Sequence, residues 1–586
     1  MKTTDPAHWP KDEVAHFLAL TRNGLDMSVQ KAESAGSMVV GSTGPFAQYA
    51  GKKAIEAGGN AVDAAVVVAT TQIALAAGAW VSFAGIATLV VYDPQTKQTH
   101  SINGPYRTFA GETDPATIPT APTPSGRTAL VPGFFAAVHA AHERFGKLPW
   151  ADVLAPAIWL ATNGIPVNDI HLGGMTLRRE QLRRLEQTRE FFFPDGADPW
   201  VAGGWFKQPA LARTLRNLAE LGPRFLYEGE WADAFVAQIS ADGGRVTKQD
   251  LASYQPIWSK PLAARVFGYD LQTVAAPDFG GAALIEGLKL LEKMRIGNPR
   301  TSADALYWLV QVVMQTSGNN IFPPAQRISD EHVARVATAM QAKGAAENPS
   351  KLIAGTHSDY TVVIDQDGMS VAMCHSINTP MWGTTCITVG GIPIPDSACF
   401  QQQQLALVKP GAYLPNPMNP SIAFKDGEPV LAFSSIGTGL VSTTLQLVHA
   451  VLGLGYSLHD AGDLPRLHGS DFRGGDSVTS GSGEGKAGVR DLARSLAEII
   501  ERAKKEAGDP RDVGFRLGQM IPLCVENGFP AEVIAGAQVR GANLIAMPLE
   551  DRALSRGFWG AISRDPRTGK LQAMRTPGAS GLVQPC

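Results

Sequence analysis

The sequence predicts a protein of mixed helices and strands, in the α/β (α+β) class. Short, strongly apolar runs of strand length alternate with longer segments in which apolar residues recur at helical spacing. Residues 358–378 hold two β-branched runs on either side of Asp367-Gly368, which is a strong hairpin signal. The 61 glycines and 40 prolines indicate many turns and a loop-rich, enzyme-like architecture.

The first half of the chain shows these elements one after another, separated by turn residues. They are a short buried strand at 38–41, a helix at 46–59 that stops at Gly58-Gly59, a helix that begins at Asn60 or Asp63, a strand at 87–93, a strand toward Ser101 and a mostly helical region at 130–260. The helix after Asn60 is apolar nearly all round, so we expect it to be buried.

Composition excludes several classes of protein. Charged residues make up only 18% of the chain, which rules out a disordered or coiled-coil protein. The 51 basic and 54 acidic residues nearly balance, so the chain has no field for binding nucleic acid or an anionic membrane. The five cysteines are scattered without a CxxC pair, and no apolar stretch could span a bilayer. We therefore expect a soluble, cytoplasmic protein without a metal site.

The predicted hairpin gathers side chains that could carry chemistry. Ser358 lies across from His375, Ser376 or Ile377, depending on the register of the two strands. Two hydroxyls and the amide of Asn378 would then meet at one end of the hairpin. A hydroxyl nucleophile needs a base, and a newly freed α-amino group on the same residue can serve. Two other readings remain open: the hydroxyls cap the strands, or His357 or His375 acts as base in an ordinary serine hydrolase.

At this point the sequence resembles the γ-glutamyltranspeptidase family of N-terminal nucleophile (Ntn) hydrolases. The most specific early match is Gly58–Ala65, which reads GGNAVDAA as in the family. Val131-Pro132-Gly133 and the helical segments after it match next, followed by 463–468 (DLPRLH) and 559–567 (WGAISRDPR). These matches occur in the family's order and cover nearly the whole chain from about residue 38 onward.

The resemblance implies a four-layer αββα sandwich, an enzyme without a cofactor, and a precursor that cuts itself between His357 and Ser358. The products would be a large segment, 1–357, and a small segment, 358–586, that stay together as two fragments and could associate further. Ser358 aligns with the family's nucleophile, with Thr356 as its rival, while Ser376 and Asn378 align with the supporting Thr and Asn.

Residues 473–488 are rich in glycine and serine, a composition that predicts a flexible insertion.

The resemblance also suggests how a substrate is bound and activated. The oxyanion would be held by main-chain N–H groups at Gly437 and Thr438, and the substrate by Arg107, Asp396 and Asn416. Arg107 is shifted by two residues from the family's Arg, and Asp396 stands three residues before the family's Asp. The family's paired serines are replaced by Asn416 and its neighbours.

These departures leave the substrate open. We expect a γ-glutamyl or related small amide that is cleaved through an acyl-enzyme and released to water or an amine acceptor. Among these, another small acyl group is favoured over γ-glutamyl, because a buried ammonium without a carboxylate partner is costly. The alternative function is that of an uncleaved, catalytically inactive family member that acts as a binding or partner protein.

Overall fold

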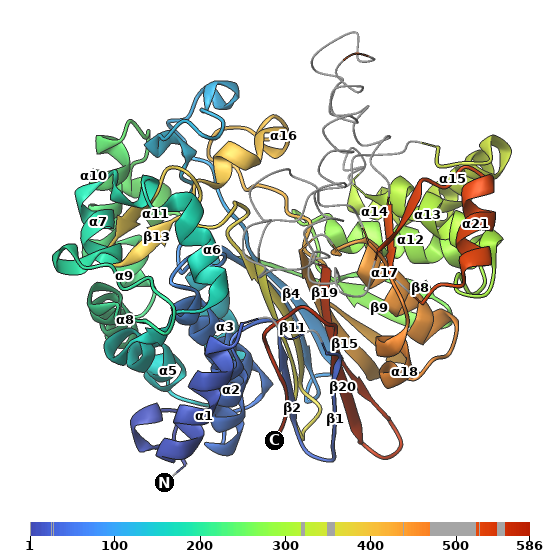
Figure 1. The fold of residues 1–586 in the computed structure, drawn as a ribbon, viewed down its shortest axis with the longest axis horizontal. Coiled ribbons are helices and arrows are strands. Elements are labelled where there is room, and N and C mark those ends of the chain that lie inside the picture. Colours follow the sequence, from blue (N-terminus) through green and yellow to red (C-terminus); the bar gives the residue numbers. More distant parts are fainter. Residues whose placement is uncertain are drawn as a thin grey trace.

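The structure, a computed structural model, describes residues 2–24, 26, 28–317, 323–347, 358–437, 439–468, 505, 523–526, 528–547 and 557–586. Within these residues, two seven-stranded antiparallel sheets stack between two layers of helices (Figure 1). The four-layer αββα arrangement predicted from the sequence is therefore confirmed. The predicted insertion at 473–488 lies outside the described residues.

The first sheet holds the predicted hairpin at its centre. Its strands are β2 (Met38–Gly41), β3 (Ile86–Asp93), β4 (Gln98–Gly104), β7 (Ile257–Ser259), β10 (Ser358–Ile364), β11 (Ser370–Ser376) and β21 (Val583–Pro585). They lie in the order β21-β2-β10-β11-β3-β4-β7, with antiparallel neighbours throughout. The hairpin turn is at Gly368, where φ is +88° and glycine is favoured.

The second sheet faces the first. Its strands are β1 (Gln30–Ser34), β8 (Leu262–Val266), β9 (Tyr269–Thr273), β14 (Ser421–Lys425), β15 (Glu428–Gly437), β19 (Gly557–Arg564) and β20 (Leu571–Arg575). They lie in the order β1-β20-β19-β15-β14-β9-β8. Short strands outside the sandwich are β5 (Ile165–Pro166), β6 (Trp205–Phe206), β12 (Ile387–Val389), β13 (Ile392–Ile394), β16 (Leu467–His468), β17 (Leu523–Glu526) and β18 (Leu544–Met547).

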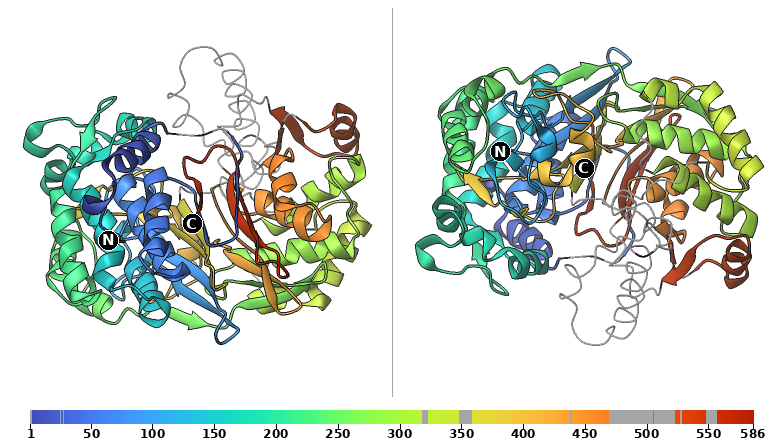
Figure 2. Two further views of the ribbon diagram at one scale, coloured as in Figure 1. Left: turned by 90° about the horizontal axis from the view of Figure 1, so that it is seen from below. Right: turned by 90° about the horizontal axis from the view of Figure 1, so that it is seen from above.

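Helices cover the outer face of each sheet (Figure 2). On the side of the first sheet lie α1 (Lys11–Arg22), α2 (Pro45–Glu56), α3 (Ala61–Ala76), α4 (Phe134–Phe145), α5 (Trp150–Asn163), α6 (Asp169–Arg178), α7 (Glu186–Phe192), α8 (Pro209–Leu221), α9 (Arg224–Tyr227), α10 (Glu230–Ala241) and α11 (Lys248–Ala252). On the side of the second lie α12 (Gly280–Lys293), α13 (Ala303–Thr316), α14 (Pro324–Arg327), α15 (Asp330–Lys343), α17 (Ser442–Val448), α18 (Leu458–Asp463) and α21 (Ala531–Val539). The short α16 (Gln402–Leu405) follows the β12–β13 hairpin.

Side chains of β10 alternate between two apolar layers, as strand geometry requires. Tyr360, Val362 and Ile364 are buried between the two sheets, in one cluster with residues of β14 and β15. Val363 faces the opposite way and joins the core beneath the first helical layer. Every even-numbered residue of β10, including Ser358 at its start, therefore faces the space between the sheets.

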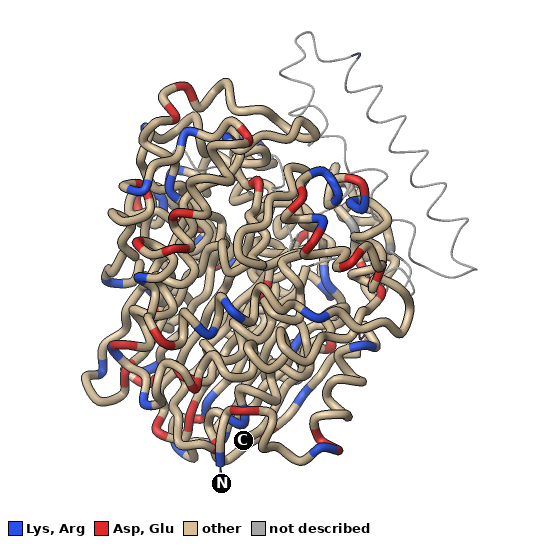
Figure 3. Tube along the Cα trace, turned by 90° about the vertical axis from the view of Figure 1, so that its left-hand side faces the viewer, with Lys and Arg blue, Asp and Glu red and all other residues tan. Residues whose placement is uncertain are grey.

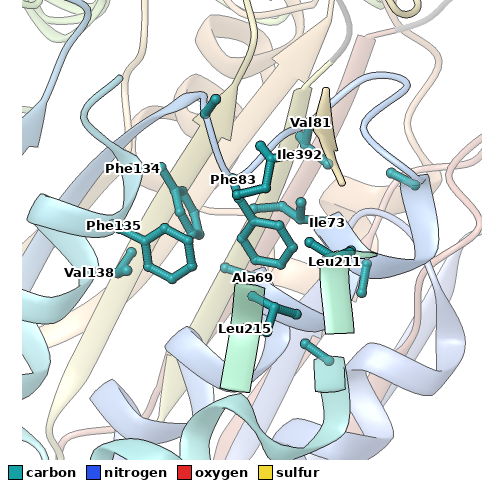
Figure 4. Packing of buried hydrophobic residues seen from close by; sticks show 14 of the residues in the cluster. Ala69, Ile73, Val81, Phe83, Phe134, Phe135, Val138, Leu211, Leu215 and Ile392 are labelled. Carbon is teal, nitrogen blue, oxygen red and sulfur yellow. The ribbon is translucent and has the colours of Figure 1, made fainter. Parts of the chain in front are cut away.

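The core under the first helical layer forms around α3, all of whose residues are buried. Figure 4 shows Ala69 and Ile73 of α3 packed near Phe83, which stacks on Phe135 of α4 with ring centroids 5.2 Å apart. Leu215 of α8 closes the other side of this cluster. The prediction of a buried helix after Asn60 is confirmed.

The GGNAVDAA segment is a helix-capping device that also holds the hairpin. Asn60 is the N-cap of α3: its side chain accepts from the N–H groups of Val62 and Asp63, and the Asp63 side chain accepts from the Asn60 N–H. At the same helix end, the carboxylate of Asp365, just after β10, accepts from the Ala61 N–H at 2.9 Å. The motif therefore ties α3 to the hairpin turn.

Both sheets contain strands from before and after residue 358. In the first sheet, β10 pairs with β2 on one side and β11 pairs with β3 on the other. In the second, β14 pairs with β9 and β20 with β1. Neither of the two sheets of the sandwich therefore comes from the large or the small predicted segment alone.

The surface carries both signs of charge. Lysine and arginine alternate with aspartate and glutamate over the face seen in Figure 3, without a region of one sign. This agrees with the balanced composition of the chain. Across the described part of the chain, none of the helices combines the length and apolar character needed to cross a membrane.

Replacing Asn60 with Ala should lower the free energy of unfolding by about 1 kcal/mol, because the N-cap bonds of a buried helix are lost. Urea denaturation followed by circular dichroism would measure the change. The control is Asn163→Ala, at the exposed C-terminal end of α5, which should change stability by less than about 0.5 kcal/mol. Equal effects of the two substitutions would contradict the role assigned to the cap.

Candidate active site

The hairpin register brings the two predicted hydroxyls together. Ser358 is paired directly with Ser376, and its hydroxyl donates to Ser376 Oγ at 2.7 Å. Both side chains are buried, with Ser358 only 8% exposed. Thr356 and His357 lie outside the described residues, so the choice between Ser358 and Thr356 as nucleophile stays a prediction.

His375 lies on the opposite face of the hairpin from Ser358. It is paired with Asp359, and its Nε2 is 3.0 Å from Gln72 Oε1 of α3. Complete burial lowers the pKa of His375 to about 3, so the ring is a much weaker base than an ordinary imidazole. The hypothesis of an ordinary serine hydrolase with His375 as base is therefore wrong.

Asn378 connects the two serines to the surrounding loops. Its N–H donates to Ser376 Oγ at 3.1 Å, and its side-chain Nδ2 donates to Asn416 Oδ1 at 2.6 Å and Gln401 Oε1 at 3.3 Å. Its φ is +50°, a left-handed conformation that asparagine tolerates better than other side chains. The sequence analysis identified Asn378 and Asn416 and missed Gln401, which has no local signal.

Two contacts fix the alignment of the facing sheets. The Tyr360 ring lies against Gly560 so closely that no side chain would fit there, and Gly560 is paired with Ser434 of β15. Toward the turn of the hairpin, Tyr92 packs edge-on against Phe424 near the start of β15, with ring centroids 5.3 Å apart. The hairpin and β15 are therefore aligned so that the end of β15 lies level with the start of β10.

This alignment determines where the turn that was predicted to hold the oxyanion lies. Gly437 ends β15 at the level of Ser358 and Ser376, and its φ of +74° allows the chain to turn sharply. The turn closes with a bond from the Leu440 N–H to the Gly437 carbonyl at 3.2 Å. Asn419 also holds it, accepting from the Ser435 hydroxyl and donating to the Leu440 carbonyl. Thr438 lies outside the described residues.

The Asp396 carboxylate already accepts four hydrogen bonds from other groups of the protein. Its carboxylate accepts from the Thr379 hydroxyl at 2.6 Å, the Thr384 N–H and hydroxyl at 2.6 and 2.9 Å, and the Thr385 N–H at 3.0 Å. Gly383 packs against the same carboxylate with no room for a side chain. Asp396 therefore organises the loop after Asn378, and a role in binding substrate stays a prediction.

Arg107 is also engaged within the protein. Its guanidinium donates to the carbonyls of Asp250 and Ser253 and to the Ser253 hydroxyl, and it lies against the rings of Tyr254 and Tyr413. Its role as a substrate ligand stays a prediction.

Unlike Arg107, the neighbouring Tyr106 points toward the segment that joins Ser376 to Asn378. Its hydroxyl lies 3.4 Å from the Ile377 carbonyl, between Ser376 and Asn378. Burial raises the pKa of Tyr106 far above its usual range, so it remains a neutral hydroxyl. Sequence reasoning missed Tyr106 because no local pattern shows which side of the short extended segment around it faces the serines.

Asp359, next to Ser358, faces the helices. Its carboxyl accepts from Ser42 at 2.6 Å, Thr43 at 2.9 Å and Trp80 Nε1 at 2.9 Å. Burial raises its pKa to about 7, although the three bonds oppose the rise. The bonds anchor the start of β10 and so fix the position of Ser358.

Comparison with known proteins finds relatives in the family that the sequence resembles. The chain matches the Gamma-glutamyltranspeptidase family model over residues 47–509. It is 25% identical to the glutathione hydrolase proenzyme of Pseudomonas aeruginosa, over 84% of this chain and 92% of the relative. It is 27% identical to the glutathione hydrolase proenzyme of Escherichia coli, over 76% of this chain and 83% of the relative. The capsule biosynthesis protein CapD proenzyme of Bacillus anthracis is 25% identical, over 70% of this chain and 74% of the relative.

Among solved structures, the cephalosporin acylase from Bacillus halodurans has the same fold. It superposes with a TM-score of 0.74 at 22% identity, over 95% of this chain and 97% of that chain. The family match spans most of the chain and includes the strand that begins at Ser358. The chain therefore belongs to the gamma-glutamyltranspeptidase family of hydrolases and transferases.

Proposed function

We propose that this chain is a self-processing amidohydrolase and acyltransferase whose nucleophile is Ser358. The observation that carries the proposal is the 2.7 Å contact from the Ser358 hydroxyl to Ser376 Oγ at the first residue of a central strand. Family membership and the proenzyme names of the relatives support it. No residue of this mechanism needs a cofactor.

The first reaction makes the nucleophile. Ser358 Oγ attacks the carbonyl carbon of His357, the peptide C–N bond breaks, and the acyl group passes from nitrogen to oxygen. Water then hydrolyses the ester, which leaves a carboxylate on His357 and a free α-amino group on Ser358. The products are the segments 1–357 and 358–586.

The second reaction uses that amine as the base. An α-amino group has a pKa of about 7.7–8.0, so a large fraction is neutral near pH 8. It takes the Oγ proton as Oγ attacks the substrate amide, and it returns the proton to the leaving amine. Main-chain N–H groups of the turn at Gly437 and Thr438 stabilise the oxyanion. Water or an amine acceptor then releases the acyl group.

The acyl group is a γ-glutamyl or related small acyl group. The relatives' names cover glutathione hydrolysis and, for the structural neighbour, acylase activity. In this chain Arg107 and Asp396 already bind protein groups, which favours an acyl group without the γ-glutamyl charges. The neutral amides of Asn378, Asn416 and Gln401 lie next to the serines and supply polar contacts.

Ser358→Ala should leave the chain as one 62.2 kDa band, with turnover at least about 10³-fold below wild type, since both reactions lose their nucleophile. A denaturing gel with N-terminal sequencing, and an amide hydrolysis assay, measure the two effects. Thr356→Ala is the matched control and should cut normally, giving a fragment that begins with Ser358. A new N-terminus at Thr356, or an uncut wild type, would refute the assignment.

Three p-nitroanilides test the acyl group: γ-glutamyl, glutaryl, which lacks the α-amino group, and butyryl, which also lacks the carboxylate. We expect kcat/KM for glutaryl or butyryl to equal or exceed that for γ-glutamyl, because the two charged anchors are engaged elsewhere. A preference for γ-glutamyl of about 100-fold or more would contradict this, since it would require dedicated polar anchors. Absorbance of released nitroaniline gives the rates.

A further inference from the structure

A buried carboxyl, Asp278, lies between the two sheets close to the serine pair. It stands between β9 and α12, is fully buried, and its Oδ2 accepts from Thr88 Oγ1 at 2.7 Å. Thr88 of β3 is in register with Cys374, two residues from Ser376 along β11 and on the same face. Asp278 therefore lies one side-chain row below the nucleophile.

The segment that carries Asp278 also holds Asn416. The Phe279 N–H donates to the Asn416 carbonyl at 2.9 Å. Gly280, the first residue of α12, packs so closely on the Pro417 carbonyl that no side chain would fit there. The start of α12 and the chain at Asn416 are therefore held in one fixed arrangement.

The two ends of the Asn416 amide have different partners. Oδ1 accepts from Asn378 Nδ2 at 2.6 Å, and Nδ2 donates to the Leu414 carbonyl at 3.2 Å. Burial raises the pKa of Asp278, and Asn416 lowers it through both its side chain and its main chain. The Asp278 Oδ2 accepts from Thr88, while Oδ1 has no hydrogen-bond partner among the described residues. Because a carboxylate can only accept, it favours the NH₂ end of the amide on its own side.

We propose that Asp278 is a positioning residue of the active site: its carboxylate orients the Asn416 amide so that Oδ1 faces Asn378, which in turn holds Ser376 beside Ser358. The chain of contacts runs from Thr88 through Asp278, Asn416 and Asn378 to the serines. This inference rests on the proposed function, because its consequence is a change in turnover.

The orientation should depend on pH. Burial raises the pKa of Asp278 to about 7, while the neighbouring Thr88 and Asn416 oppose the rise. The titratable groups that face it are Cys374 of β11 and Tyr254 after α11, and burial raises both of their pKa values, so they stay neutral. A protonated Asp278 can donate as well as accept, so it no longer favours the NH₂ end of the Asn416 amide over its oxygen. The carboxylate form is therefore the active one. Its protonation below about pH 7 adds to the loss of turnover that protonation of the α-amino base already causes.

Asp278→Asn removes the selective acceptor with almost no change in volume. On the best wild-type substrate, kcat should fall about tenfold above neutral pH and much less below it, with KM nearly unchanged. The wild-type to variant ratio of kcat therefore rises with pH between about 5.5 and 9.5. A constant ratio, or a change confined to KM, would overturn the proposal.

Thr88→Val keeps the Asp278 carboxyl and removes the hydroxyl that donates to it. The pKa of Asp278 should therefore rise, and the acidic limb of the kcat–pH profile should lie at higher pH in the variant than in the wild type. The matched control is Thr361→Val, a buried threonine of β10 that faces the helices and donates to the Val40 carbonyl. It should leave the limb in place. Equal shifts in the two valine variants would mean that loss of any buried threonine has this effect, and the proposal would fail.

A crystal structure of Asp278→Asn provides a measurement that does not depend on turnover. The Asn378 Nδ2 to Asn416 Oδ1 contact should lengthen beyond hydrogen-bond range or be replaced by a rotated amide. Retention of the 2.6 Å contact would overturn the inference even if the variant were slow. A wild type inactive on every acyl anilide would instead refute the proposed function, and the structure of the variant would still decide the role of Asp278.

Discussion

The register of one hairpin decides which side chains meet at the proposed active site. Pairing of Ser358 with Ser376 places both hydroxyls in the space between the sheets, and a slip of one residue would send them to the helix side. Several bonds prevent that slip. Asp365 holds the turn through the N–H groups of Asp367 and Met369 and ties it to α3, and Asp359 is anchored at the other end. Both carboxyls are thus structural, although both belong to the hairpin that carries the two serines.

The charged groups near the site mostly serve the fold. Asp396 and Asp359 have their hydrogen bonds satisfied by hydroxyls and N–H groups, and Arg107 is enclosed by carbonyls and two aromatic rings. Such burial is tolerable only because each charge has partners within the protein. The groups placed beside the serines are amides and a tyrosine hydroxyl, which donate and accept without carrying charge.

Local sequence signals were sufficient for the framework of the fold. The Asp-Gly turn predicted the hairpin, and Asn60 marked the start of α3, because turn and cap preferences depend on a few neighbouring residues. The spacing of the hairpin brought Ser358 close to Ser376, and the family resemblance added the four layers and the roles of the two serines.

The partners of Asp396, Arg107 and Asp278 could not be predicted. The guanidinium of Arg107, for example, binds residues about 140 positions away, at Asp250 and Ser253. Gln401 and Tyr106 were missed for the same reason, since tertiary packing alone brings them to the site. Cytoplasmic location and the division at residue 357 stay predictions from the sequence.

The interleaving of strands from before and after Ser358 has a consequence for the order of events in the life of the chain. Because β10 is flanked by β2, and β11 by β3, the surroundings of Ser358 exist only when distant stretches of the chain have come together. On the proposed route, the base is absent until that assembly is complete and the bond is cut. Activity then depends on complete folding, because a chain that has not finished folding has no free α-amino group on Ser358 and cannot turn over substrate.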